Sequence, residues 1–159
     1  MRYVIDGHNL IPKVGLNLAS PDDEMDLVML LQEFSRTRRA KAEVFFDGAP
    51  AGVAGTRRLG MVRAHFVRVG TTADAAIRAW LHRIRPSARG WTVVSSDREV
   101  QQAARHAGAA VISAEAFARL VQDEKRRRGP ASKASSDKQE GPMSDAELNQ
   151  WLDLFRRHT

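Results

Sequence analysis

Near its amino terminus the chain reads Val4-Ile5-Asp6-Gly7-His8-Asn9-Leu10. The apolar run Tyr3-Val4-Ile5 predicts a short buried strand that begins almost at the first residue. The strand ends in an aspartate and a glycine, and an aspartate is rarely found in a hydrophobic core. Ligands of open α/β sheets bind just outside the carboxyl ends of the strands. The stretch therefore predicts one strand of such a sheet and the beginning of a functional site.

Two later segments repeat this pattern of an apolar run that ends in an aspartate. Val44-Phe45-Phe46 is followed by Asp47-Gly48, and Trp91-Thr92-Val93-Val94 is followed by Ser95-Ser96-Asp97. A fourth aspartate, Asp74, follows another predicted strand at the start of a helix. Since the carboxyl ends of parallel strands meet at one edge of a sheet, we expect negative charge to gather there. Taken alone, each acid is equally well explained as a turn or helix-start residue.

The remaining pattern alternates strands and helices. Apolar runs predict strands at 3–5, 43–47, 65–69, 91–95 and 109–112. Helical spacing of apolar residues predicts helices at about 22–38, across 76–84, to about 106, and from Ser113 to about 128. Ser96 and Glu99 fit a capping box for the third of these helices. This order favours an α/β fold with a mostly parallel sheet of about five strands, covered on both faces.

The segment 48–60 carries four glycines and few large apolar residues, so it predicts a mobile surface loop. Since it follows Asp47 directly, we expect it to overhang the acidic edge. Arg57 and Arg58 would then lie on a lid that could grip phosphates. Solvated charges on a disordered excursion explain the same residues equally well.

Composition narrows the class of protein. The chain has 159 residues, 43% of them hydrophobic, which suits one globular domain with a short appendage. It has no cysteine, which excludes disulfides, thiolate zinc sites and a cysteine nucleophile and fits a cytoplasmic protein. No apolar run approaches the roughly 20 residues of a membrane helix, and the immediate start of a strand argues against a signal peptide.

Charge is distributed unevenly. The whole chain carries a net charge of +6, whereas residues 129–159 contain four Lys/Arg and five Asp/Glu, which leaves +7 on the body. A basic body suits a polyanionic partner such as nucleic acid. Ordinary solvated surface is the alternative.

The carboxyl-terminal part predicts a separate unit. Residues 129–142 are rich in Gly, Pro, Ser and Lys and predict a flexible linker. Residues 143–158 predict an amphipathic helix with an apolar stripe of Leu148, Trp151, Leu152 and Phe155. So short a helix is marginal alone. We expect it to pack on its own body, on a second copy as a homodimer, or on another protein.

The aspartates predict metal chemistry if they converge. Crowded carboxylates repel one another unless a cation neutralises them. Oxygen ligands without histidine or cysteine spacing favour Mg²⁺ or Mn²⁺ over zinc. Such an ion can activate water and offset the charge on a phosphodiester in the transition state. Phosphodiester cleavage would therefore explain why a basic protein holds its acids together.

Four motifs carry a resemblance to a known family. They are Val4-Ile5-Asp6-Gly7-His8-Asn9-Leu10, Phe45-Phe46-Asp47-Gly48, Thr72-Ala73-Asp74 with Ile77, and Ser95-Ser96-Asp97-Arg98-Glu99. In order and spacing they resemble the YacP-like NYN domains of the PIN-like ribonuclease group, over residues 1–128. The resemblance implies a three-layer α/β/α sandwich that cleaves RNA endonucleolytically with a metal ion. It also implies that Asp6, Asp74 and Asp97 are metal ligands, that Asn9 supports the site, and that Asp47 is a fourth acid.

Two positions depart from the family pattern. His8 stands where many members have tyrosine, and Ala75 stands where many have a second acid. The missing carboxylate leaves open a one-metal site, or a non-catalytic module that binds RNA or the ribosome. RNA, including mRNA on the ribosome, is the expected partner, with His8, Arg57, Arg58 and Arg98 as candidate contacts.

Overall fold

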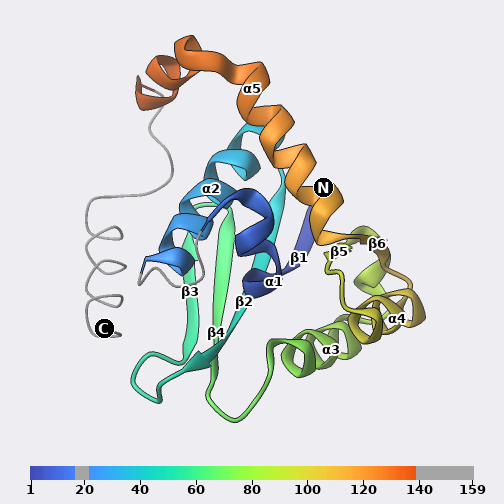
Figure 1. Cartoon of the computed structure of the whole chain (residues 1–159). Helices are drawn as coiled ribbons and strands as arrows, with labels where there is room; N and C mark the ends of the chain where they lie inside the picture. The colour runs from blue at the N-terminus through green and yellow to red at the C-terminus, as the bar shows by residue number, and fades with distance from the viewer. Residues whose placement is uncertain (17–21, 139–159) are drawn as a thin grey trace.

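A computed structural model describes residues 1–16 and 22–138, with the backbone alone over 128–138. Within these residues six strands form one sheet in the order β3-β4-β2-β1-β5-β6 (Figure 1). Neighbouring strands are parallel, except that β3 is antiparallel to β4. The strands are β1 (Arg2–Asp6), β2 (Lys41–Ala49), β3 (Gly55–Leu59), β4 (Val62–Arg68), β5 (Thr92–Val94) and β6 (Ala110–Ile112).

Helices cover both faces of this sheet. They are α1 (Gly7–Leu10), α2 (Asp23–Arg38), α3 (Ala73–Ile84), α4 (Arg98–Ala107) and α5 (Ala114–Lys138), with short 3₁₀ turns η1 (Ile11–Val14) and η2 (Ser87–Gly90). Because side chains alternate along a strand, β2 contributes Phe46 to one face and Phe45 to the other. Phe46 packs in the same core as Leu31 of α2 and Phe117 of α5. Phe45 packs with α3 and α4. The predicted three-layer α/β/α fold is confirmed.

The topology brings several chain turns to one edge of the sheet. The strands β1, β2, β4 and β5 are parallel, so their carboxyl ends meet at the lower edge of the sheet in Figure 1. The helices α1, α3 and α4 begin just beyond β1, β4 and β5. Asp6 pairs in register with Phe45, which leaves Asp47 just past the same level of the sheet. The three aspartates predicted at strand ends therefore lie at the same edge of the sheet, although β2 continues to Ala49 and β5 ends at Val94.

The segment predicted as a mobile lid is ordered differently. β2 continues to Ala49, and Gly55–Leu59 forms the edge strand β3, so the expectation of a loop over 48–60 is wrong. Leu59 is fully buried and anchors the strand. Arg57 and Arg58 pair with Ala64 and Arg63 of β4, away from the carboxyl edge. The sheet thus has one more strand than the five expected.

The carboxyl-terminal segment also differs from the expectation. The last helix, α5, continues to Lys138 and so runs through much of the predicted 129–142 linker. The predicted helix at 143–158, and with it the question of a homodimer or protein partner, lies outside the described residues. Across the described ranges, no helix combines the length and apolar character that a membrane span requires.

Candidate metal and nuclease site

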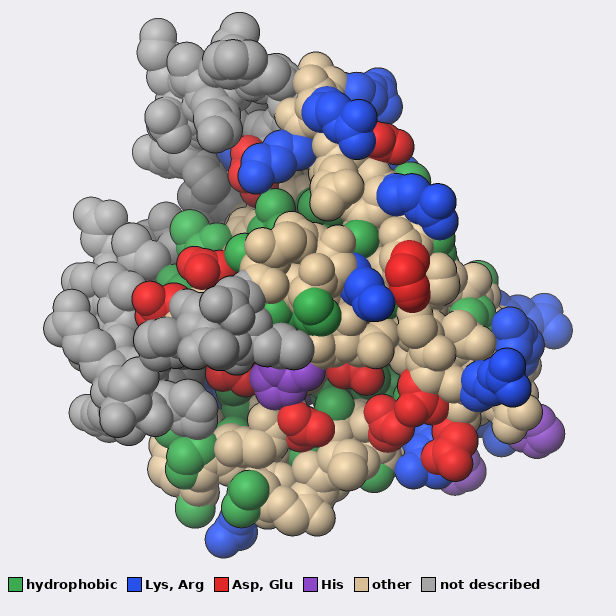
Figure 2. All heavy atoms as spheres, viewed as in Figure 1, with side chains coloured by type: hydrophobic (Ala, Val, Ile, Leu, Met, Phe, Trp, Pro, Cys, Tyr) green, Lys and Arg blue, Asp and Glu red, His purple; other side chains and the backbone are tan. Residues whose placement is uncertain are grey.

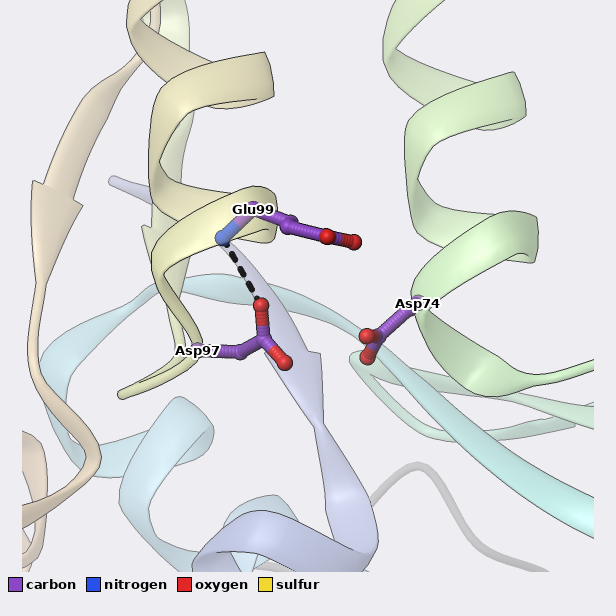
Figure 3. A group of neighbouring side chains, drawn as sticks. All are labelled: Asp74, Asp97 and Glu99. Atoms are coloured by element: carbon purple, nitrogen blue, oxygen red, sulfur yellow. Dashed lines mark hydrogen bonds between the residues drawn. The ribbon is translucent and has the colours of Figure 1, made fainter.

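Three carboxylates meet where α3 and α4 begin. Asp74, Asp97 and Glu99 each offer one oxygen, and these oxygens lie within 4.8 Å of one another. Figure 3 shows Asp74 extending from the first turn of α3 toward Asp97 and Glu99 of the α4 start. We call these three residues the acidic cluster. Such a group of hard oxygen donors has the chemistry of a site for a divalent cation.

Local hydrogen bonds fix each of these acids. Thr72 caps α3 by accepting a hydrogen bond from the backbone N–H of Ala75, which places Asp74 in the first turn. Asp97 caps α4, because its Oδ1 accepts from the N–H groups of Glu99 (2.8 Å) and Val100 (3.3 Å). Its other oxygen is directed toward Asp74 in Figure 3. The helix therefore holds one oxygen of Asp97 and leaves the second for a ligand.

The predicted capping box at Ser96 is displaced by one residue. Asp97 is the cap, and the Ser96 hydroxyl instead donates to the carboxylate of Glu115, at 2.5 Å from Oε1. The same hydroxyl accepts from the N–H of Ala114. Because Asp97 and not Ser96 is the N-cap, Glu99 is not at the position of a capping-box partner. Its carboxylate extends toward α3 instead (Figure 3).

Asp6 lies buried beside this cluster. It is only 8% exposed, and burial together with the negative charge of Asp74 raises its pKa to about 6. The backbone N–H of Asn9 donates to its carboxylate and opposes this shift, while the charge of Asp47 adds to it. The pKa of Asp74 is also raised, first by its partial burial and then by the adjacent carboxylate of Asp97. The edge thus carries more negative charge than its own surroundings neutralise.

His8 connects Glu24 and Asp47, two further acids near Asp6. Its Nε2 lies 2.9 Å from Oε2 of Glu24, and its Nδ1 lies 2.9 Å from Oδ1 of Asp47. The bond to Glu24 outweighs the effect of burial and, with Asp47, raises the pKa of His8 to about 9. At neutral pH the ring is therefore an imidazolium that donates from both nitrogens. Figure 2 shows acidic side chains and one histidine in a band from below α1 to the start of α3.

Asn9 connects the two halves of the site. Its Oδ1 accepts a hydrogen bond of 3.1 Å from the backbone N–H of Ser96, in the loop that carries Asp97. Its own backbone N–H donates to Asp6. One residue of α1 therefore restrains both the buried aspartate and the start of α4.

Comparison with known proteins identifies the family. A model of the YacP-like NYN domain matches residues 3–156, nearly the whole chain. The chain belongs to the YacP-like NYN domain family. Two crystal structures of Rae1 (YacP) from Bacillus subtilis, one of them a tryptophan-to-leucine mutant, resemble this NYN domain with a TM-score of 0.66 and 23% sequence identity. The mutant aligns over 97% of this chain and 91% of its own, and the other over 99% and 95%. No curated protein matches the sequence.

The NYN domain brings together most of the residues that the motifs single out. Asp74 and Asp97 share the acidic cluster, and Asp6 lies close enough to Asp74 and Asp47 for their charges to raise its pKa. Asp47 itself stands apart from the cluster, because Oδ1 bonds to His8 and Oδ2 accepts from the N–H of Ala73 at 3.5 Å.

The three arginines predicted to contact RNA lie at different distances along the chain from the acidic cluster. Arg98 is exposed as the first residue of α4, directly after Asp97. Arg57 donates to the carbonyl of Thr56, and Arg58 donates to that of Gly60. Both lie on the edge strand rather than on a lid, so their placement gives no support to a role at the acidic edge.

Sequence reasoning missed two acids of the site. Glu99 was predicted only as a helix cap, although its position two residues after Asp97 in a first turn could have signalled a shared ligand set. Glu24 is 16 residues from His8 in sequence and approaches it only because α2 packs beside α1. No local pattern indicates that contact.

Proposed function

We propose that this NYN domain is an endoribonuclease that depends on Mg²⁺ or Mn²⁺ and acts on RNA in the cytoplasm, including mRNA on the ribosome. The observation that carries the proposal is the acidic cluster beside the buried Asp6, at the carboxyl edge of a chain with a net charge of +6. Acids crowded in this way do not bind RNA phosphates by themselves. With a divalent ion they complement the phosphodiester that a basic surface attracts.

The donor set fits such an ion. Asp74, Asp97 and Glu99 provide only carboxylate oxygens, which suit Mg²⁺ and Mn²⁺. The raised pKa of Asp74 shows that its negative charge is poorly compensated. A cation would reverse that penalty, because it favours the ionised carboxylates. We propose these three residues as ligands, with Asp6, whose pKa the charge of Asp74 raises, as a fourth.

When bound, the ion would supply Lewis-acid chemistry, activating water and offsetting charge on the phosphodiester. The residues of the chain have separate tasks. Asp97 is held by two backbone N–H groups, so it keeps its orientation when substrate enters. The Asp6 carboxyl would be ionised when it binds the ion, because the cation would offset the burial and the neighbouring charge that raise its pKa in the metal-free site. His8 stays protonated and holds Asp47, whereas Asn9 holds the loop before Asp97.

Cleavage of a panel of single-stranded and structured RNAs with Mn²⁺ tests this function. We expect Asp97→Asn and Asp6→Asn to lower the rate by at least about 100-fold, because each removes a carboxylate that is proposed to hold the ion. Asp123→Asn is the matched control, since Asp123 lies exposed on α5, where it pairs with Arg126. Equal activity in the wild type and in the two site variants would assign the cleavage to a contaminant.

A non-catalytic module that binds RNA or the ribosome is the second candidate, and Ala75 is the observation in its favour. No carboxylate follows Asp74, and the N–H of Ala75 serves only the helix cap. If this candidate is correct, RNA binding should weaken as the salt concentration rises. Calorimetry should then detect no binding of Mn²⁺ to the protein. Mn²⁺ binding that disappears in Asp74→Ala would contradict it.

A further inference from the structure

A groove runs between α3 and α4, next to the acidic cluster. It encloses about 390 Å³, within the roughly 300–1,000 Å³ of ligand pockets in general. Its floor includes the buried Leu81. Its polar lining consists of Arg78 and His82 from α3, Arg85 directly after that helix, and Glu99, Gln102 and His106 from α4. We call it the α3–α4 groove.

The groove is continuous with the proposed metal site. Glu99 belongs to both, since it lines the groove and contributes an oxygen to the acidic cluster. Asp74 lies one turn before Arg78 on α3, and the Arg78 Nε lies 3.5 Å from the carbonyl oxygen of Asp74. Both helices begin at the acidic edge, so the lining from position 99 to position 106 extends roughly 10 Å away from it along the helix. Figure 3 shows Glu99 in the first turn of α4, with its side chain extending toward α3.

The charge of the lining changes with distance from the cluster. Glu99, at the near end, is the one acid among the groove residues, and beyond it come Arg78, Arg85 and the two imidazoles. These side chains are exposed at the rim, over an apolar floor. Guanidinium groups present a planar fork that matches phosphate oxygens. A basic rim over an apolar floor suits a nucleotide, whose phosphate meets the rim while its base covers apolar surface.

We propose that the α3–α4 groove binds the backbone phosphates of single-stranded RNA beside the bond that is cleaved at the acidic cluster, an inference that rests on the proposed function. The strand enters along Arg85 and Arg78 and reaches the cluster at Glu99. Arg85 is the decisive residue, because it lies at the far end of the groove from the acids. Arg98, at the start of α4, lies outside the lining of the groove.

The test measures binding without cleavage. A fluorescein-labelled single-stranded RNA is titrated with the full chain in EDTA, and its anisotropy gives Kd at several salt concentrations. We expect Arg85→Gln to raise Kd about tenfold, as for the loss of one charge-assisted phosphate contact, and to reduce the salt slope by about one. Arg105→Gln is the matched control, because Arg105 is exposed on α4 and does not line the groove. It should change Kd less than about twofold.

A second variant that adds charge distinguishes a lost RNA contact from a loss of folding, because a misfolded protein would not bind RNA more tightly. Gln102→Arg adds a cation inside the groove and should lower Kd, with circular dichroism melting as the check on structure. Equal Kd values for Arg85→Gln and Arg105→Gln, together with no gain from Gln102→Arg, would overturn the inference. Because EDTA removes metal chemistry, the two proposals fail separately. If Arg85→Gln weakens RNA binding but the wild-type protein cleaves no RNA, the groove remains an RNA-binding site. The proposal of nuclease activity is then refuted.

Discussion

Asp6 is a buried carboxyl whose surroundings disfavour its ionised form. Its carboxyl is 8% exposed, and its pKa of about 6 means that the folded protein holds this proton more tightly than the unfolded chain does. Stability therefore decreases as pH rises from about 4 to about 6, and the penalty persists above that range. A site that destabilises its own fold in this way is typical of residues kept for chemistry.

Replacing that carboxyl should stabilise the metal-free protein. We expect Asp6→Asn to raise the free energy of unfolding at pH 8 by at most roughly 3 kcal/mol, because the neutral amide carries no buried charge. Near pH 4 the gain should vanish, since the wild-type carboxyl is then protonated as well. Urea unfolding in EDTA at both pH values measures this, with Asp123→Asn as the exposed control. Destabilisation at pH 8 would show that Asp6 is already well compensated.

His8 contributes the opposite pH dependence. Its pKa of about 9 lies above the unfolded value of 6.5, so its ion pairs stabilise the fold fully below pH 6.5. That stabilisation is lost as pH rises through 9. We expect His8→Gln to cost about 1–2 kcal/mol at pH 6.5 after allowance for solvent screening, and nearly nothing at pH 10. Urea unfolding of His8→Gln and of the exposed His82→Gln measures the difference. A gap that stays constant with pH would refute the charged state of His8.

At the scale of elements, the short helix α1 orients Asp6, His8 and Asn9 and depends on a close approach at Gly7. A Cβ atom on Gly7 would collide with the ring of the buried Phe46 and lie 3.0 Å from the carbonyl oxygen of Phe45. The strand β2 and the start of α1 can therefore touch only through a glycine. The Asp-Gly pair thus has a packing reason besides its turn chemistry.

Gly7→Ala should accordingly destabilise the fold by about 1–3 kcal/mol, the usual cost of overpacking a core. Gly52→Ala is the matched control, because a Cβ there meets nothing within 4 Å and should change stability by less than about 0.5 kcal/mol. Thermal unfolding of both variants measures the contrast. If the two variants melt alike, β2 and α1 do not form the contact described.

The elements also show where sequence reasoning succeeds. The run before Asp6 and the stripe of α3 are decided by local hydrophobic spacing, so both were predicted. The strand β3 has one buried apolar residue, Leu59, and gains its structure from pairing with β4, which no local pattern reveals. The contact between His8 and Glu24 depends likewise on helix packing. Local pattern identified the acids Asp6, Asp74 and Asp97, but not Glu24, the residue that contributes most to the raised pKa of His8.

At the scale of the whole molecule, the charge of +6 and the acidic edge must act together. A chain that binds RNA through a few phosphate contacts releases the counterions held there. We expect the affinity for single-stranded RNA in EDTA to fall roughly tenfold between 50 and 200 mM salt. Anisotropy titrations at fixed pH measure the slope. A Kd that does not change with salt concentration would indicate that the basic body does not contact the RNA backbone.

The proposed nuclease activity requires that the acidic cluster hold a divalent ion. A crystal soaked in Mn²⁺ and measured for anomalous scattering tests it most directly. We expect a peak at roughly 2.0–2.3 Å from carboxylate oxygens of Asp74 and Asp97, with Glu99 completing the site, and no such peak in crystals of Asp97→Asn. A wild-type crystal without density between these residues, or with Mn²⁺ bound only elsewhere, would show that the acidic cluster is not a metal site.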